Sequence, residues 1–348
     1  TCVLANGFAA MIDIPGLNYR TQRYKESYDQ LPQNLILGSE TASTVSSRGV
    51  YKFPVEDKKS AKYEDHQCSS YDVEACSWSN IPDEDFALAD DNHWTIGQFV
   101  WTGFDYLGEP SPYDTDAWPN HSSMFGIIDL ASLPKDRYYL YRSVWNKDAE
   151  TLHILPHWTW PGREGEVTPV FVYTNYPTAE LFINGKSYGK QSKNNSSLKN
   201  RYRLMWMDAV YEPGEVKVVA YNKDGKAVAE KVVRTAGKPH HIELVSNRNE
   251  LTADGKDLAY VTVKVVDKDG NLCPTDNRQI NFSAKGAGKY RAAANGDPTN
   301  LEQFHLPKMH AFNGMLTAII QAGETAGEIV FTAKANGVKA GNIRIQTK

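Results

Sequence analysis

The sequence predicts a multidomain chain in which an α/β part is followed by all-β parts. Its 348 residues correspond to two or three domains at about 150 residues each. Short apolar runs separated by helix-compatible stretches occupy the first part, a pattern typical of parallel βα units. Beyond residue 150 the pattern changes to strands joined by tight turns, which is typical of small β-sandwiches.

Three apolar runs in the first part predict short buried strands at Met11–Ile14, Leu35–Leu37 and Ile96–Trp101. The stretch Tyr24–Leu31 between the first two runs is compatible with a helix. The segment Asp136–Asn146 carries four aromatic residues and predicts an amphipathic helix that closes this part.

The second part begins near residue 150 and predicts a first sandwich. A strand is expected at Val170–Tyr173, and another at Glu180–Ile183 runs into Asn184-Gly185, the strongest short hairpin signal. Two further strands are expected at Glu215–Tyr221 and Val228–Val233, on either side of a turn.

A second boundary near Gly237–Pro239 introduces another sandwich. Its expected strands, separated by further turn signals, are Ile242–Val245, Tyr260–Val265, Ile280–Ser283, Leu316–Gln321, Glu328–Ala333 and Asn342–Gln346. The sequence therefore predicts three domains, at residues 1–149, 150–237 and 238–348.

Charge and composition exclude several functions. The net charge of -4 provides no basic field for nucleic acid or an anionic membrane, and no apolar run reaches the roughly 18 residues of a membrane-spanning helix. Four cysteines without a C-x-x-C pair predict neither a disulfide scaffold nor a zinc site. We expect no cofactor or metal.

Two clusters of potential metal ligands have simpler interpretations. His66, Cys68 and Cys76 lack the spacing of a metal site and are expected to be loop residues. The acidic residues Asp83–Asp85 and Asp90-Asp91 lack a calcium-binding loop and are expected to be a helix start with solvated charges.

The chain is rich in aromatic residues, with 8 Trp and 19 Tyr. Such side chains suit sugar binding, because a pyranose ring presents an apolar face that packs on an aromatic ring. A strand-rich fold also uses many aromatics for packing, so composition alone leaves both interpretations open.

Polar and aromatic residues follow the predicted strands of the first part, as Asn18-Tyr19, Ser39-Glu40, and Trp101 with Asp105. In a parallel βα barrel the carboxyl ends of the strands carry the active site. Glu40 is therefore a candidate nucleophile, although an exposed glutamate at a strand end is an equally ordinary feature. Ser39 is not in a G-x-S-x-G motif.

Several of these segments resemble a known family. The run Leu35–Ser43 resembles the nucleophile strand of glycoside hydrolase family 2, the β-galactosidase and β-glucuronidase family. Gly97–Pro110 resembles the eighth barrel strand of its Bacteroides-type β-galactosidases, and Ser123–Leu130 with Pro134–Tyr139 resembles the stretch that follows. Together these matches cover residues 8 to 146. Residues 150 to 348 resemble the accessory β-sandwich domains of the same enzymes.

The resemblance implies a specific fold. Residues 1–149 would be the C-terminal part of a (β/α)8 TIM barrel, strands six to eight, followed by two immunoglobulin-like β-sandwich domains. It also implies that an N-terminal half of the same enzyme, with five barrel strands and the acid/base glutamate, lies upstream of Thr1.

The resemblance further implies the activity of a retaining exo-β-glycosidase that hydrolyses terminal β-D-galactosides. Glu40 would be the nucleophile and Tyr19 would orient it, while Trp101 would form a wall of the sugar subsite. Asn18 and Asp105 would support substrate binding, although for Asp105 a buried structural ion pair is an equal expectation. Glu109 is the strongest rival of Glu40, but Gly108 and Pro110 place it in a loop.

Other assignments stay open at this stage. The enzyme could be a β-glucuronidase or another family 2 β-glycosidase, and the sandwich domains could form a non-catalytic carbohydrate-binding or spacer array. The resemblance alone suggests a periplasmic or secreted bacterial protein. The expected partners are a β-galactoside or related glycan, the N-terminal half, and a second copy in a homo-oligomer.

Overall fold

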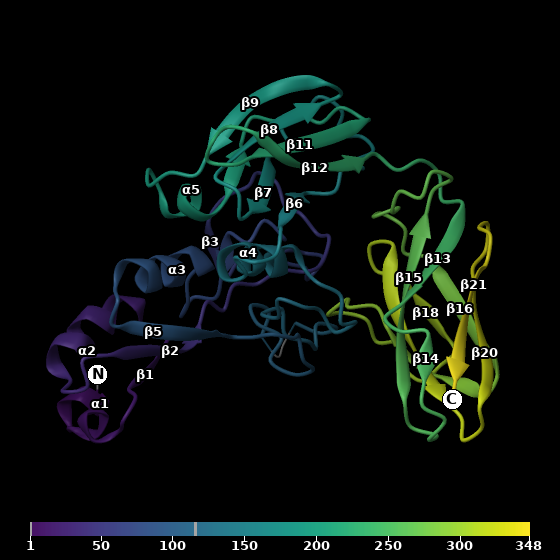
Figure 1. Ribbon diagram of the computed structural model, residues 1–348, viewed down its shortest axis with the longest axis horizontal. Coiled ribbons are helices and arrows are strands. Elements are labelled where there is room, and N and C mark those ends of the chain that lie inside the picture. The colour runs from purple at the N-terminus through teal and green to yellow at the C-terminus, as the bar shows by residue number, and fades with distance from the viewer. Residues whose placement is uncertain (1, 115–116) are drawn as a thin grey trace.

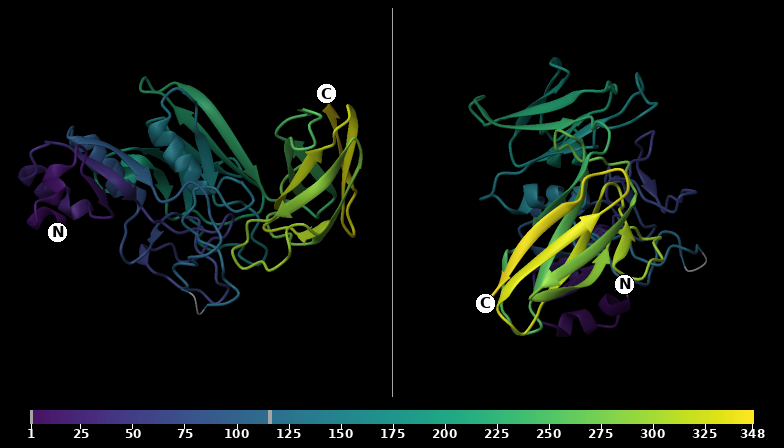
Figure 2. Two further views of the ribbon diagram at one scale, coloured as in Figure 1. Left: turned by 90° about the horizontal axis from the view of Figure 1, so that it is seen from below. Right: turned by 90° about the vertical axis from the view of Figure 1, so that its right-hand side faces the viewer.

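The computed structural model describes residues 2–114 and 117–348, which form three successive units (Figure 1). We call residues up to 149 the first unit, residues 150–237 the second unit and residues 238–348 the third unit. The second unit lies over the helices of the first, and the third unit lies beside the loops of the first (Figures 1 and 2). No helix among the described residues has the length and apolar character needed to cross a membrane.

The first unit is built on a three-stranded parallel sheet in the order β1-β2-β5, formed by Gly16–Asn18, Ile36–Thr41 and Thr95–Val100. Its remaining elements are α1 (Cys2–Ala5), η1 (Phe8–Met11), η2 (Thr21–Arg23), α2 (Tyr24–Gln30), β3 (Lys58–Lys59), β4 (Glu74–Ala75), α3 (Pro82–Asp91) and α4 (Asp136–Trp145). The expected strands at Leu35–Leu37 and Ile96–Trp101 and the helices at Tyr24–Leu31 and Asp136–Asn146 are confirmed with small shifts of their ends.

The expected strand at Met11–Ile14 is wrong. Met11 ends the short helix η1, the following three residues form bends, and the strand begins only at Gly16. The side-chain amide of Gln33 donates hydrogen bonds to the carbonyl oxygens of Ala9 and Ile12, at 3.0 and 2.6 Å. These backbone acceptors are therefore satisfied without a strand partner, and Met11 is 83% exposed.

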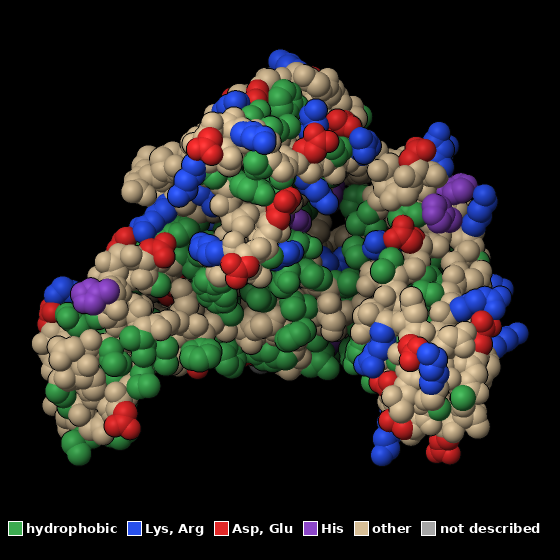
Figure 3. All heavy atoms as spheres, in the orientation of Figure 1, with side chains coloured by type: hydrophobic (Ala, Val, Ile, Leu, Met, Phe, Trp, Pro, Cys, Tyr) green, Lys and Arg blue, Asp and Glu red, His purple; other side chains and the backbone are tan. Residues whose placement is uncertain are grey.

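Strand β5 is not buried on both faces as expected. Ile96 and Phe99 are 50% and 65% exposed, so two large apolar side chains of this strand are not covered by the described chain. Figure 3 shows hydrophobic side chains gathered along the lower edge of the first unit. Large apolar side chains left exposed on a sheet indicate a surface that another segment covers.

The acidic cluster does begin a helix, since α3 starts at Pro82, but its charges are not all solvated. Asp83 and Asp85 are buried. The guanidinium of Arg203, in the second unit, forms an ion pair with Asp83, and both side chains are completely buried. Asn80 donates a hydrogen bond of 2.6 Å to Asp85. Burial of charge is tolerated here because each carboxylate has a partner.

The second unit contains two sheets that share one core. The three-stranded sheet has the order β10-β7-β6 and the four-stranded sheet the order β12-β11-β8-β9. The strands are β6 (Leu152–Leu155), β7 (Val170–Thr174), β8 (Thr178–Ile183), β9 (Lys186–Ser192), β10 (Leu204–Trp206), β11 (Glu215–Tyr221) and β12 (Ala227–Arg234), with one helix, α5 (Leu198–Tyr202). All four expected strands are confirmed. Asn184 and Gly185 adopt φ of 49° and 80°, which a tight hairpin turn requires.

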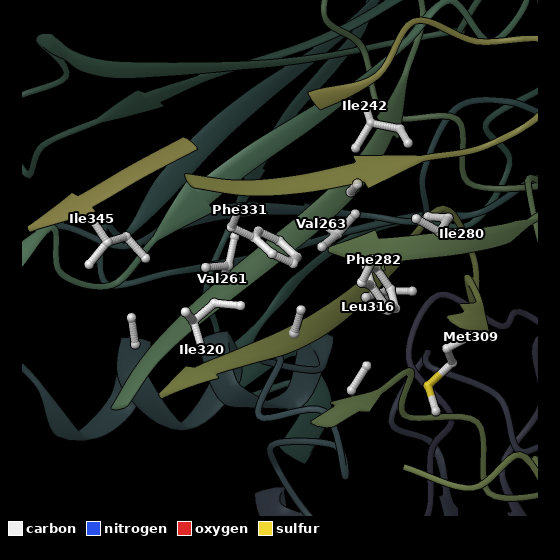
Figure 4. Packing of buried hydrophobic residues seen from close by; sticks show 14 of the residues in the cluster. Ile242, Val261, Val263, Ile280, Phe282, Met309, Leu316, Ile320, Phe331 and Ile345 are labelled. Atoms are coloured by element: carbon white, nitrogen blue, oxygen red, sulfur yellow. The ribbon is translucent and has the colours of Figure 1, made fainter. Parts of the chain in front are cut away.

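The third unit is a sandwich of a four-stranded sheet, β13-β15-β19-β17, and a five-stranded sheet, β14-β21-β20-β16-β18. Its strands are β13 (His241–Ser246), β14 (Glu250–Leu251), β15 (Leu258–Val266), β16 (Gln279–Gly286), β17 (Gly288–Ala294), β18 (Lys308–His310), β19 (Met315–Ala322), β20 (Gly327–Lys334) and β21 (Gly341–Thr347). Val261 and Leu316 from one sheet pack with Phe331 and Ile345 from the other (Figure 4). All six expected strands are confirmed.

Candidate active site

The parallel strands of the first unit bring their polar ends to one edge of the sheet. The amide of Tyr19 donates a hydrogen bond of 2.9 Å to the carbonyl oxygen of Glu40, and the amide of Trp101 donates one of 2.9 Å to that of Thr41. The ends of β1, β2 and β5 are thus fixed to one another by backbone hydrogen bonds. The expected juxtaposition of Tyr19, Glu40 and Trp101 is present.

Tyr19 is directed at Glu40. Its backbone has a φ of 53°, a left-handed conformation that is uncommon outside glycine and is found at functional turns. Burial raises the pKa of the Tyr19 hydroxyl, and a hydrogen bond to the Glu40 carboxylate together with its negative charge raises it further. The phenol therefore stays protonated and is available as a hydrogen-bond donor to Glu40.

Ser43 is a third side chain of this group. It is buried, and its hydroxyl has no hydrogen-bond partner of good geometry, although it lies close enough to Tyr19 to lower the pKa of the phenol. The sequence analysis did not single out Ser43, and no spacing or charge pattern marks it. Its position depends on the path of the chain after β2.

Trp101 is connected through Tyr106 to a second carboxylate, that of Glu109. The Trp101 indole Nε1 donates a hydrogen bond of 3.2 Å to the Tyr106 hydroxyl, which in turn donates to the Glu109 carboxylate. Glu109 is exposed and in a loop, as expected, yet its negative charge also raises the pKa of Tyr19. The site therefore combines two carboxylates with an indole and two phenols.

Asn18 and Asp105 have different surroundings. The exposed Asn18 side chain accepts a hydrogen bond of 2.7 Å from Ser39. Asp105 is buried, and its carboxylate binds the Lys135 ammonium at 2.6 Å and the Gly126 amide at 2.8 Å. Burial raises the pKa of Asp105 to about 6, against the opposing effect of Lys135. The structure thus gives Asp105 the contacts of a buried ion pair that anchors the loop after β5.

The described residues hold no group of three His, Cys, Asp or Glu side chains with the geometry of a metal site. Cys68 and Cys76 are buried free thiols, and burial raises their pKa, to about 12 for Cys76. They are therefore un-ionised near neutral pH. His66 lies in a loop beside Tyr113, with ring centroids 5.2 Å apart.

This arrangement suits nucleophilic attack at an electrophilic carbon. A carboxylate such as Glu40 has the oxygen atoms that nucleophilic attack requires, and the Tyr19 hydroxyl interacts with it. Trp101, at the end of the neighbouring strand, carries an aromatic surface of the kind on which an apolar ring face packs.

Comparison with known proteins agrees with this geometry. The family described as glycoside hydrolase family 2 C-terminal domain 5 matches residues 242–344, and a domain of unknown function, DUF4982, matches residues 165–229. The β-galactosidase BoGH2A of Bacteroides ovatus is 39% identical over 98% of this chain. A putative β-glucuronidase of Formosa agariphila is 36% identical over 60% of it.

Solved structures show the same relationship. A β-glycosidase from Bacteroides vulgatus superposes with a TM-score of 0.83 at 28% identity and covers 97% of this chain. A glycosyl hydrolase family 2 member from Bacteroides cellulosilyticus has a TM-score of 0.80 at 27% identity and covers 99%. The chain spans only 40% of BoGH2A, and 45% and 43% of these two structures.

The parallel sheet followed by two units of two sheets each is the arrangement that this chain shares with the β-glycosidase from Bacteroides vulgatus. The chain belongs to glycoside hydrolase family 2 and represents its C-terminal region.

Proposed function

We propose that this chain supplies the nucleophile of a retaining exo-β-glycosidase that removes terminal β-D-galactosyl groups. The observation that carries the proposal is the position of Glu40 at the end of β2, where the Tyr19 phenol faces its carboxylate. A protonated donor beside a strand-end carboxylate keeps the carboxylate ionised and aimed, as a nucleophile requires.

The proposed reaction is a double displacement. A Glu40 oxygen attacks the anomeric carbon while an acid/base carboxyl group about 5–5.5 Å away protonates the departing oxygen. The bond from the anomeric carbon to the leaving group breaks, and an ester between the sugar and Glu40 forms. Water, deprotonated by the same acid/base group, then cleaves the ester and releases the sugar with its configuration retained.

The acid/base group is proposed to come from an upstream part of the same enzyme, which would also complete a (β/α)8 barrel. Two observations support this. The chain spans 40% of the length of BoGH2A. In addition, Ile96 and Phe99 of β5 are large apolar side chains left exposed, as expected of a strand that further barrel segments would cover.

A galactoside is favoured over a glucuronide by the charges of the described site. Glu40 and Glu109 are negative, whereas Lys135 is buried in its ion pair with Asp105. A uronate carboxylate prefers a site with a free cation, because like charges brought together cost free energy. The 39% identity to a β-galactosidase over 98% of the chain points the same way.

The test uses the full-length enzyme. A fluorosugar that traps the glycosyl ester should label Glu40, as mapped by peptide mass spectrometry, and Glu40→Gln should lower kcat by several orders of magnitude. Glu109→Gln is the matched control, and it should be labelled at Glu40 as the wild type is. Labelling at Glu109 would refute the assignment, and turnover of aryl β-glucuronide in preference to galactoside would refute the sugar.

The expectations of a periplasmic or secreted location and of a homo-oligomer stay predictions. Immunoglobulin-like topology for the second and third units likewise remains part of the proposal. The two-sheet architecture of both units supports it.

A further inference from the structure

Arg48 joins the first unit to the third through buried hydrogen bonds. Its Nε donates to the Asp129 carboxylate at 2.6 Å, and both side chains are almost completely buried. One terminal nitrogen of the same guanidinium donates to the carbonyl oxygens of Asn295 and Phe312, at 2.8 and 3.0 Å. A single cation thus binds two loops of the third unit and one loop of the first.

The third unit fits closely around this cation. Gly296, at φ 82°, lies so near Asp129 that a Cβ added to it would stand 2.0 Å from the carboxylate. The Asn313 side chain donates a hydrogen bond of 2.8 Å to the carbonyl oxygen of Arg48, and the guanidinium lies 5.5 Å from the Phe312 ring. A larger residue at position 296 would displace either the Asp129 carboxylate or the loop that carries it.

Arg48 ends the segment that begins at the candidate nucleophile. Every residue from Thr41 to Arg48 is buried, and we call this segment the buried strap. Its amides donate to two parts of the first unit, the stretch 68–79 and Met124, with Ser43 bonded to Ser79, Val45 to Glu74, Ser46 to Met124 and Ser47 to Cys68. Because the strap is buried along its whole length in a closely packed interior, a displacement of Arg48 strains the residues before it.

The buried strap contacts the site at two places. At its beginning, Ser43 lies against the Tyr19 phenol that faces Glu40. Farther along, the carbonyl oxygen of Ser46 accepts a hydrogen bond of 2.7 Å from Lys135, which also holds Asp105. Asp105 belongs to the loop that follows Trp101, so the strap is linked to both strand ends that form the site.

We infer that Arg48 is a positioning residue, through which the third unit holds the buried strap, and with it Tyr19 and Glu40, in the reactive geometry. The inference rests on the proposed function of Glu40. Through Arg48 the third unit would affect the rate of the reaction, although none of its residues touches the reacting atoms.

Arg48→Lys in the full-length enzyme tests this inference. Lysine keeps the charge for Asp129 but cannot also bind both carbonyl oxygens of the third unit, because it lacks the guanidinium fork. We expect kcat to fall about 10- to 100-fold with KM within about twofold, since a misplaced nucleophile slows chemistry more than binding. Arg48→Met, which removes the cation paired with the buried Asp129 carboxylate, should lose more.

The pH profile separates positioning from a loss of stability. Poorer alignment of Tyr19 weakens its hydrogen bond to Glu40, so the acidic limb of kcat/KM should move to higher pH in both variants. A change that only lowers the amount of folded enzyme would scale the profile without moving it.

Gly296→Ala tests the same contact from the third unit and leaves every residue of the first unit unchanged. It should reproduce the loss of kcat and should speed amide hydrogen exchange in Thr41–Arg48, a readout independent of activity. Lys199→Ala is the matched control, because Lys199 also joins two units, through an exposed ion pair of 2.5 Å with Asp57 away from the strap. It should leave kcat, the pH profile and the exchange unchanged.

Two results would overturn the inference. One is wild-type kcat and pH dependence in both Arg48→Lys and Gly296→Ala. The other is unchanged exchange in the strap when the third unit is displaced. If the wild-type enzyme lacks glycosidase activity, the proposed function fails by itself, and the exchange experiment still decides whether Arg48 couples the third unit to the strap.

Discussion

His157 is held as a neutral ring at the contact between the first and second units. The imidazole stacks on Trp160 with ring centroids 4.0 Å apart and meets the edge of Tyr51 at 5.4 Å. Its Nδ1 accepts a hydrogen bond of 3.3 Å from the Thr159 amide. Burial lowers the pKa of His157 to about 4, against the opposing charge of Asp136.

This low pKa predicts a pH-dependent stability. In the unfolded chain a histidine has a pKa near 6.5, so between about pH 6.5 and 4 the unfolded state binds more protons than the folded state. The free energy of unfolding should therefore decrease as the pH falls through this window, by roughly 1–3 kcal/mol from His157. Urea denaturation at several pH values measures it.

His157→Phe keeps an aromatic ring but cannot titrate, so its stability should fall less steeply than that of the wild type over the same window. His305→Phe, at an exposed position, is the control and should follow the wild-type slope. Equal slopes for the wild type and His157→Phe would mean that the ring is not held neutral.

The site residues differ in how far the sequence could predict them. Glu40 and Trp101 follow apolar strands, and a parallel arrangement brings such strand ends together, so their proximity was predictable. The Tyr106–Glu109 hydrogen bond and the contact of Ser43 with Tyr19 depend on loops whose course no periodicity reveals. The ion-pair partner of Asp105 could not be predicted either, because Lys135 lies 30 positions away on another loop.

At the scale of the elements, the backbone of the loop after β5 passes very close to the backbone at Gly126. A Cβ at Gly126 would lie 2.2 Å from the backbone nitrogen of Asp105 and 2.5 Å from the carbonyl oxygen of Ile128. The Gly126 amide also donates to the Asp105 carboxylate. Two backbones can approach this closely only because the residue has no side chain.

Gly126→Ala should therefore destabilise the first unit by at least about 3 kcal/mol, because the obstructing atoms are backbone atoms that no rotamer change can move. Chemical denaturation of the chain measures the change. Gly103→Ala is the matched control in the same region, since its Cβ would meet nothing within 4 Å, and it should cost less than about 0.5 kcal/mol. Similar losses in both variants would contradict the steric explanation.

The strands of the second and third units were easier to predict than the beginning of the first unit. The Asn184-Gly185 turn determines the hairpin of β8 and β9 locally, and this hairpin and the strand at Glu215–Tyr221 are confirmed. The strand at Met11–Ile14 was wrong because Gln33, distant in sequence, satisfies the backbone there. The buried charge of Asp83 was missed because its partner, Arg203, comes from another unit.

At the scale of the whole molecule, the open sheet predicts that the chain alone has negligible glycosidase activity. Its three parallel strands leave Ile96 and Phe99 exposed, and the proposed reaction needs an acid/base group from upstream. We expect the isolated chain to associate through this apolar surface, which light scattering would detect.

Adding the separately produced upstream part should restore hydrolysis of an aryl β-galactoside. A mixture in which this chain carries Glu40→Gln is the control and should stay inactive. Near-native turnover by the isolated chain would show that an acid/base group lies within residues 1–348 and would contradict the proposal.

The buried pair of Asp83 and Arg203 also bears on how this protein can be altered by recombination. A breakpoint near residue 150 would part the guanidinium from its carboxylate and leave an uncompensated charge inside each product. We therefore expect a chimera to keep its stability only when the second unit is transferred together with helix α3.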